Sequence, residues 1–267
     1  MTEQRTSGQD RPHPHLRVDR EGPVLTISLS NPERRNAKTP SLWLALAELA
    51  ETLDPEVRVV VLRADGPSFS AGLDLAMLTP EGVDGEVSML EQAARGAQEM
   101  ADVIAPFQRG FSAWADVDAV VVAAVQGHAI GAGFQLALAA DLRVVADDVQ
   151  LAMRETSLGL VPDLAGTAPL VHLVGYSKAL EICATGRTVH ADEAVAIGLA
   201  SVAVRVDELE ATTADLVSAL LAAPEPALRE LKPLLRRAVT ATRDDQLRHE
   251  REAQGRLMHA LVTRPRH

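Results

Sequence analysis

Aromatic residues and cysteine are scarce in this chain of 267 residues. Phe, Trp and Tyr make up 3% of the sequence, whereas hydrophobic residues make up 47%. The core must therefore be built from Ala, Val and Leu, as in layered α/β folds, and the aromatic platforms on which nucleic-acid bases stack are missing. A single cysteine, Cys183, excludes an internal disulfide framework and is compatible with a reducing cytosol. Its apolar surroundings are typical of a core residue.

Positive charge and long apolar runs are also in short supply. The formal net charge is −11, whereas binding to a nucleic-acid backbone requires a basic face, so no nucleic-acid partner is expected. The most apolar region, 119–141, is interrupted by Gln126, His128 and Gln135. It never reaches the roughly 18 uninterrupted apolar residues of a membrane-spanning helix. Residues 1–15 lack the apolar stretch of a secretory signal, so we expect a disordered tail on a cytoplasmic protein that is not bound to a membrane.

Strand and helix patterns alternate after this tail. Short apolar and β-branched runs at 24–29, 57–63, 119–125 and 142–146 predict strands, and those at 57–63 and 119–125 are typical of buried strands. Thr39, Pro40 and Ser41 predict the start of a helix with leucines at helical spacing. Residues 75–116 predict a helical and loop excursion, and most of the chain after Val206 is helical. We therefore expect an α/β core over 16–206 and a helical region over 207–267.

Two glycine-containing turns, 68–75 (SFSAGLDL) and 127–141 (GHAIGAGFQLALAAD), each follow a predicted buried strand. The second turn opens into a helix, whose free N–H groups and positive dipole end favour an anion. Leu136 stands where a dinucleotide-binding fingerprint needs its third glycine, and the chain has neither a phosphate-binding loop nor a hydrolase nucleophile elbow. The histidines form no metal-ligand motif, so no metal is expected, and His128 is interpreted as a hydrogen-bonding loop residue.

These turns, followed by RETSLGLVPDLAGT, LVG and ATGRTVHADEAVAIGLA, resemble the enoyl-CoA hydratase/isomerase (crotonase) family in order and separation over about residues 24–206. The resemblance implies a crotonase-like spiral of ββα units with a helical C-terminal trimerisation region. It also implies an acyl-CoA thioester as substrate and a homotrimer or a dimer of trimers as the assembly. No separate cofactor is implied, because coenzyme A is part of the substrate.

The resemblance assigns an oxyanion hole to the backbone N–H groups of Leu73 and Ala132. Loss of a proton next to a thioester carbonyl places negative charge on its oxygen, and one such donor contributes about 3 kcal/mol of transition-state stabilisation. The same resemblance assigns the substrate and its coenzyme A moiety to residues around the two turns. These are Arg34, Arg35, Ala71, Gly72, Asp74, Gly131 and Gly133.

The acidic residues depart from the hydratase pattern. Hydratases that resemble this chain carry glutamates at the positions of Gln135 and Glu155, and the amide of Gln135 cannot accept a proton as a carboxylate does. Asp163 stands where many hydratases have glycine, and its spacing of eight from Glu155 resembles that of dienoyl-CoA isomerases. Glu155, Asp163 and Gln135 are therefore the candidate catalytic residues.

This set favours an enoyl-CoA isomerase of fatty-acid or related acyl-CoA metabolism. One carboxylate removes a proton, the oxyanion hole holds the dienolate, and the same or a second acid returns the proton elsewhere. If Glu155 and Asp163 share an apolar pocket, burial and like charge should raise and separate their pKa values. Two alternatives stay open: a hydratase that adds water to 2-enoyl-CoA, and a non-catalytic acyl-CoA-binding protein.

Overall fold

The computed structural model describes residues 12–263, which form two compact units. The first unit ends at Asp215 and the second begins at Leu216, inside helix α8 (Leu209–Ala222). The sequence placed a boundary earlier, after Val206. Most of the predicted disordered tail lies outside the described residues, but 12–15 are described, and His13 Nε2 lies 3.0 Å from Ser41 Oγ.

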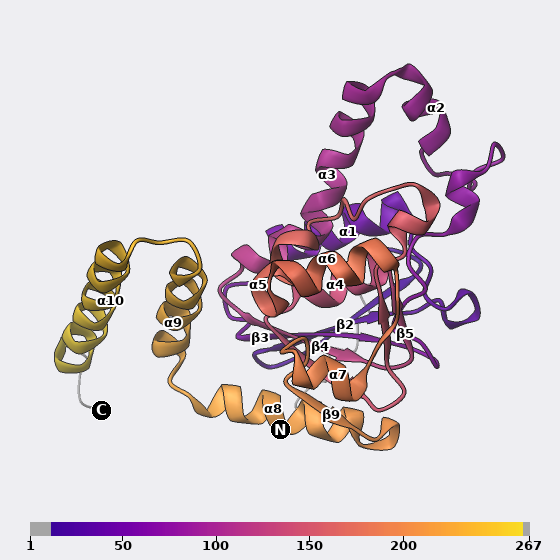
Figure 1. The fold of residues 1–267 in the computed structure, drawn as a ribbon. Helices are drawn as coiled ribbons and strands as arrows, with labels where there is room; N and C mark the ends of the chain where they lie inside the picture. The colour runs from indigo at the N-terminus through magenta and orange to yellow at the C-terminus, as the bar shows by residue number, and fades with distance from the viewer. Residues whose placement is uncertain (1–11, 264–267) are drawn as a thin grey trace. The chain divides into compact units, whose positions relative to one another are not determined.

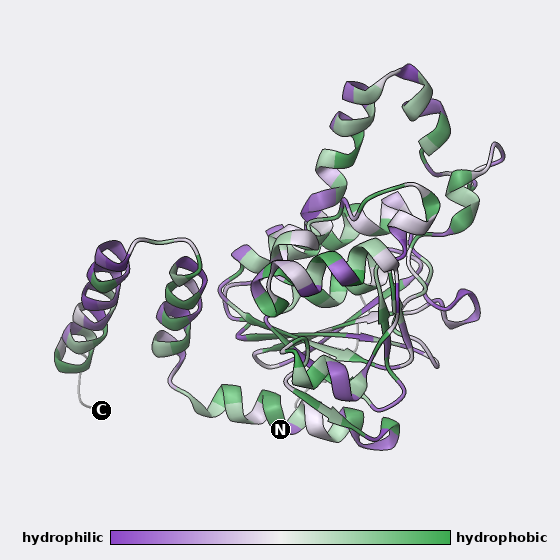
Figure 2. Ribbon diagram, viewed as in Figure 1, coloured by the Kyte–Doolittle hydropathy of each residue, from purple (hydrophilic) through white to green (hydrophobic). Residues whose placement is uncertain are grey.

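A six-stranded sheet organises the first unit, in the order β1-β2-β3-β4-β6-β9. Its strands are β1 (Leu16–Glu21), β2 (Val24–Leu29), β3 (Val59–Ala64), β4 (Val120–Val125), β6 (Leu142–Ala146) and β9 (Val202–Val204). β1 pairs antiparallel with β2, and the remaining neighbours pair parallel. The central strands are apolar along their length (Figure 2), and every residue of β4 is buried, as expected for a sheet covered on both faces.

A second, smaller sheet has the order β5-β7-β8. It contains β5 (His128–Ile130), β7 (Gln150–Ala152) and β8 (Val189–His190). The chain passes from β4 to β5 and then into a helix, and from β6 to β7 and then into helical segments, so each of these two turns of the chain adds a strand to both sheets. This arrangement confirms the predicted spiral of ββα units. Sequence analysis treated β5 as part of a turn.

Helices α1, α4, α5 and α6 lie close together over one side of the sheets in Figure 1, whereas α2 and the start of α3 extend away from them. The first unit contains helices α1 (Pro40–Glu51), α2 (Met89–Arg95), α3 (Ala97–Asp116), α4 (Ala132–Ala139), α5 (Thr167–Val174), α6 (Tyr176–Thr185) and α7 (Ala191–Ala196). The short helices are η1 (Pro32–Arg34), η2 (Leu75–Leu78), η3 (Glu155–Leu158) and η4 (Val206–Glu208). Several of the few aromatic rings join α1 to α3: Trp43 packs on Phe107 and Phe111 at centroid distances of 5.5 and 6.1 Å.

The second unit contains α9 (Glu225–Ala238) and α10 (Arg243–Thr263). The two helices are joined by an ion pair between Arg256 and Glu230 at 2.6 Å and by a hydrogen bond from Gln246 Nε2 to the Leu234 carbonyl at 3.2 Å. Large apolar side chains remain exposed on both helices, namely Leu231, Leu235, Leu247, Met258 and Leu261. Over residues 12–263, no helix combines the length and the apolar character needed to cross a membrane.

Candidate active site

The turn after β3 brings Leu73 against the start of α4. Gly72 has a φ of +93°, and a Cβ atom at this position would lie 2.6 Å from the Ile130 carbonyl oxygen and 3.6 Å from the Ala132 nitrogen. Only glycine fits such a close approach at a positive φ. The Leu73 amide therefore lies close to the Ala132 amide, although the two residues come from different turns of the spiral.

Both amides are available to a ligand. α4 begins at Ala132, immediately after Gly131, and the first N–H groups of a helix have no acceptor within the helix. In the part of the chain that the structure describes, neither the Leu73 N–H nor the Ala132 N–H has a hydrogen-bond acceptor. A Cβ atom at Gly133 would lie 2.6 Å from the Ser70 carbonyl oxygen, so a second glycine keeps the two turns together. The geometry can place one ligand oxygen between two N–H donors at a helix N-terminus.

Glu155 follows β7 and directs its carboxylate to the same place. A Cβ atom at Gly131 would lie 3.2 Å from Glu155 Oε1, and this oxygen accepts a hydrogen bond from Gln135 Nε2 at 2.8 Å. The other oxygen, Oε2, is buried and has no hydrogen-bond partner within residues 12–263. Burial raises the pKa of Glu155, and the negative charge of Asp163 raises it further. Glu155 thus offers one unpaired oxygen whose affinity for a proton is increased.

Gln135 links the Glu155 side chain to the backbone of the 164–166 loop. Its side chain is buried on α4, and its Oε1 accepts hydrogen bonds from the backbone N–H groups of Leu164 at 2.9 Å and Gly166 at 3.2 Å. Its Nε2 donates to Glu155 Oε1. An ionised glutamate here could accept the same two backbone bonds but could not donate to Glu155. The amide therefore both fixes the 164–166 loop on α4 and orients the carboxylate of Glu155.

Asp163 lies near Glu155, since its charge contributes to the raised pKa of Glu155. Burial raises the pKa of Asp163 as well. The Asp163 carbonyl oxygen accepts a hydrogen bond of 2.7 Å from Gln108 Nε2 on α3, a residue that sequence analysis did not single out. Cys183 packs against the core as expected, but it also lies close enough to Glu155 that burial first and the Glu155 charge second raise the pKa of the thiol.

The predicted coenzyme A residues gather around the Leu73 turn. The Arg34 guanidinium lies 2.9 Å from the Asp74 carboxylate, and the Arg34 side chain remains 59% exposed, so it can still meet a second anion. The Arg35 carbonyl, in a residue with a φ of +49°, accepts the Ala71 N–H at 2.8 Å. His128, interpreted as a hydrogen-bonding loop residue, lies on β5 with its Nδ1 at 3.1 Å from Ser68 Oγ.

Sequence analysis missed Lys38. Its backbone N–H donates to the Gly72 carbonyl at 2.8 Å and its carbonyl accepts the Asp74 N–H at 2.9 Å, so Lys38 pairs with the segment that carries Leu73. The side chain has 0% exposure, and its Nζ has no hydrogen-bond partner among the described residues. Burial lowers the pKa of Lys38 to about 7. A lysine just before a helix is typical of a polar turn, so no sequence pattern marks it as buried.

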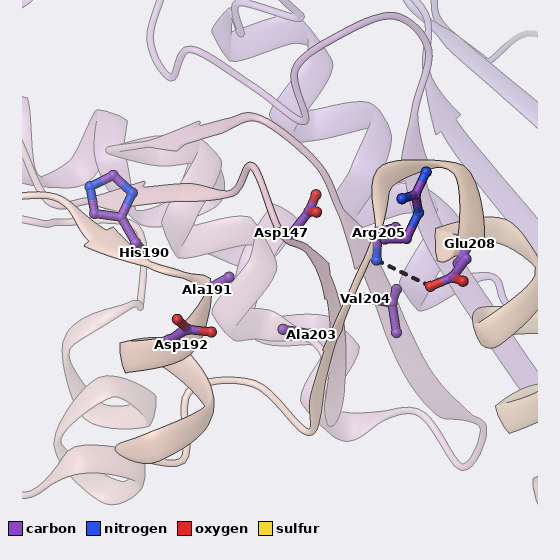
Figure 3. Close-up of a pocket in the computed structure, with 8 residues that line it drawn as sticks. All are labelled: Asp147, His190, Ala191, Asp192, Ala203, Val204, Arg205 and Glu208. Carbon is purple, nitrogen blue, oxygen red and sulfur yellow. Dashed lines mark hydrogen bonds between the residues drawn. The ribbon is translucent and has the colours of Figure 1, made fainter.

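A surface hollow of about 450 Å³ lies elsewhere in the first unit. Figure 3 shows its lining residues: Asp147, His190, Ala191, Asp192, Ala203, Val204, Arg205 and Glu208. None of the predicted site residues belongs to this hollow. Three carboxylates and one guanidinium line it, and this guanidinium, of Arg205, is paired with Asp207 at 2.9 Å. This charge pattern disfavours an anionic thioester.

The comparisons with known proteins agree with the fold. The family model described as enoyl-CoA hydratase/isomerase matches residues 19–264. The chain belongs to the enoyl-CoA hydratase/isomerase family. It is 35% identical over 224 residues to the carnitinyl-CoA dehydratase of Salmonella enteritidis PT4 (strain P125109), an alignment that covers 83% of this chain and 80% of that protein. The family predicted from the sequence is thereby confirmed.

Solved structures of family members resemble the whole chain. A Thermobifida fusca YX protein, provisionally assigned as an enoyl-CoA hydratase and solved with acetoacetyl-CoA, is 47% identical with a TM-score of 0.86, over 92% of this chain and 95% of that chain. The structure titled as its complex with CoA gives 45% identity and a TM-score of 0.88, over 94% of this chain and 95% of that one. The chain therefore has the crotonase fold and is a family enzyme that acts on CoA thioesters.

Proposed function

We propose that this enzyme moves the double bond of an enoyl-CoA through a thioester enolate. The observation that carries the proposal is the single unpaired carboxylate oxygen, Glu155 Oε2, close to the two free amides of Leu73 and Ala132. Double-bond migration needs one group that removes a proton and an oxyanion hole for the resulting charge. Water activation by the hydratase pattern needs a second carboxylate, and Gln135 provides an amide that is bound to the protein at both ends.

In the proposed reaction, the thioester oxygen of a 3-enoyl-CoA accepts hydrogen bonds from the Leu73 and Ala132 N–H groups. Glu155 Oε2 removes a proton from the α carbon, the C–H electron pair forms the dienolate, and negative charge moves onto the thioester oxygen. The same proton then returns to the γ carbon, which leaves the double bond between the α and β carbons. The raised pKa of Glu155 suits both steps, because a catalytic acid–base group works best when its pKa is near the ambient pH.

Hydration or dehydration is the second candidate, and Asp163 is the observation that favours it. A relative with 35% identity carries the name carnitinyl-CoA dehydratase. In a dehydration, Glu155 would remove the α proton while Asp163, whose pKa is raised by burial, would protonate the departing hydroxyl group. Gln135 would then orient Glu155 without touching water.

The remaining features of the proposal concern binding and assembly. We assign the coenzyme A moiety to the Leu73 turn, where Arg34 and Arg35 provide positive charge, and we propose a cytoplasmic enzyme that needs no cofactor beyond its CoA thioester. The apolar residues exposed on α9 and α10 form a surface that a second copy could cover, which supports a homotrimer or a dimer of trimers.

Incubation of the purified protein with 2-enoyl-CoA, 3-enoyl-CoA and dienoyl-CoA thioesters tests the proposal. Double-bond migration without formation of a hydroxyacyl product is the expected result. Water addition to 2-enoyl-CoA as the fastest reaction would instead identify a hydratase. Saturable binding without any product would identify a non-catalytic acyl-CoA-binding protein.

A further inference from the structure

We propose that Lys38 stabilises the thioester enolate from behind the oxyanion hole, as a buried amine that carries a proton when the enolate forms. The inference rests on the proposed function, because it requires an enolate bound at Leu73 and Ala132. It assigns Lys38 the role of a positioning residue: the side chain acts on the bound charge across the Leu73 turn without touching the substrate.

Both the backbone and the side-chain amine of Lys38 have defined contacts. Its backbone pairs in parallel with Leu73, and the side chains of directly paired residues stand on the same face of a sheet. Its Nζ lies 5.7 Å from the centre of the Phe69 ring. Phe69 and Leu73 belong to one segment, so the amine lies along the turn whose backbone approaches the start of α4.

Lysine is rare in this chain, so its presence at position 38 is informative about function. The sequence contains only three lysines, Lys38, Lys178 and Lys232, against 23 arginines. Arginine stays protonated in proteins, whereas a buried lysine can lose and regain its proton. The one basic side chain buried beside the oxyanion donor is thus the type that can change charge. A buried amine without a partner is also costly to folding, which points to a use for it.

The charged groups around Lys38 are engaged with other partners. On the Leu73 side, the Asp74 carboxylate is bound by Arg34 and by the Ala76 N–H. On the α1 side, Glu86 accepts hydrogen bonds from the Ser41 N–H and hydroxyl, and His13 lies against the same hydroxyl. Burial alone accounts for the lowered pKa of Lys38. The negative charge that the amine can meet is therefore the charge that arises on the substrate.

The size of the effect follows from the geometry of a parallel pair. Neighbouring strands lie about 4.8 Å apart, and a hydrogen bond adds about 2.9 Å, so the Lys38 backbone lies roughly 8 Å from the enolate oxygen; the amine, at the end of a side chain that stands off the plane of the strands, lies farther away, at roughly 10 Å. At that separation an ammonium group in a protein shifts the enolisation equilibrium by about tenfold, or about one pKa unit. By reciprocity, the enolate raises the pKa of Lys38 by the same amount.

Acetoacetyl-CoA is a suitable probe, because its enolate absorbs in the near ultraviolet and forms without further reaction. Wild-type enzyme saturated with acetoacetyl-CoA is titrated from about pH 5 to about pH 10, and the apparent enolisation pKa is compared with those of Lys38→Met and Lys38→Gln. The control variant is Lys178→Met, which removes an exposed lysine of α6 that pairs with Glu181. Affinity for CoA itself is measured in parallel as a test of folding and binding.

We expect both Lys38 variants to raise the enolisation pKa of the bound probe by about one unit, a tenfold change, with CoA affinity unchanged and Lys178→Met equal to the wild type. If the Lys38 variants bind CoA and titrate like the wild type, the role of Lys38 is wrong and the proposed function stands. If the saturated wild type forms no enolate at any pH, the proposed function and the role of Lys38 are both wrong.

Discussion

Glu155 and Lys38 are two buried ionisable groups, one beside Gly131 and one paired with Leu73, and they are held in different ways. Glu155 is bound through one oxygen to Gln135, which is itself tied to the backbone of the 164–166 loop. Lys38 is held by hydrogen bonds of its backbone alone; its amine lies 5.7 Å from the centre of the Phe69 ring and, within the described chain, has no hydrogen-bond partner.

Burial moves both groups toward their neutral forms. The pKa of Glu155 is raised by burial, and the pKa of Lys38 is lowered to about 7 by the same cause. The carboxylate must reach the α and γ carbons of the substrate and is therefore oriented by an amide. The amine acts through its charge alone, for which direction matters less than distance. Five substitutions test this difference between Glu155 and Lys38 and the roles of the residues around them.

Glu155→Gln should have the largest effect on turnover. The variant keeps an oxygen for the Gln135 hydrogen bond but has no proton acceptor, so kcat should fall by about 10²- to 10⁴-fold while thioester affinity changes little. Steady-state kinetics and equilibrium binding measure the two quantities, and Glu181→Gln on the surface of α6 is the control. Turnover at the wild-type rate would remove Glu155 from the mechanism.

Lys38→Met should stabilise the protein, because methionine fills the space without a buried amine. Between pH 7 and pH 10.5 the unfolded chain binds a proton that the folded protein releases, so wild-type stability rises with pH across this window. The stability gain of the variant should be roughly 4 kcal/mol near pH 7 and should shrink toward pH 10.5. Denaturant unfolding at several pH values measures it. A gain that does not depend on pH would show that the amine is not neutral in the folded protein.

Gly72→Ala should disrupt the oxyanion hole from the backbone side. The added Cβ would meet the Ile130 carbonyl oxygen, and displacement of one donor should lower kcat by about 10²- to 10³-fold. Gly82→Ala is the matched control, because Gly82 also has a positive φ, of +66°, but has open space around it. Equal losses of activity in the two variants would mean that backbone strain, and not the approach of the two turns, causes the effect.

Gln135→Glu should shift the reaction toward water addition. The new carboxylate can still accept the Leu164 and Gly166 N–H groups, but it must share a proton with Glu155, as two close carboxylates do. We expect the ratio of hydration to double-bond migration to rise about tenfold, measured by product analysis. Gln135→Met, which removes both the amide and any acid, should show no such rise, and a rise in both variants would refute this explanation.

Asp163→Asn should have the smallest effect if the enzyme is an isomerase that depends on Glu155 alone. Removal of the Asp163 charge lowers the pKa of Glu155, so the acidic limb of the kcat/KM profile should move to lower pH with only a few-fold change at its plateau. A loss of about 10²-fold or more at the plateau would instead assign Asp163 the role of a catalytic acid, as in the dehydratase candidate.

The sequence predicted those parts of the fold whose patterns are local. Runs such as 24–29 and 142–146 are short, apolar and bounded by turns, and they coincide with β2 and β6. β1 was missed because LRVDRE at Leu16–Glu21 is mostly charged and lies at the edge of the sheet, where only one neighbour pairs with it. β5 was hidden in a glycine-rich turn because a strand of three residues has too few positions to show a period.

The residues of the site also fall into two groups, those that the sequence predicts and those that only the folded structure reveals. Leu73, Ala132 and Glu155 could be named from motif resemblance, because backbone donors and a single acid occupy fixed places in those motifs. The backbone partners of Gln135, Leu164 and Gly166, could not be predicted, because they lie in a loop more than 25 residues further along the chain and reach it only in the folded protein. Lys38 gives no sequence signal because its burial arises from the elements that pack around it.

Hydrogen exchange at the α carbon of a 3-enoyl-CoA in D₂O tests the central claim most directly, because it reports enolate formation whatever the final product. Mass spectrometry of recovered thioester and product should show deuterium uptake with the wild type, and no uptake above the uncatalysed rate with Glu155→Gln at saturating substrate. Exchange that is absent from the wild type, or equally fast in the variant, would contradict an enolate formed by Glu155 beside the Leu73 and Ala132 amides.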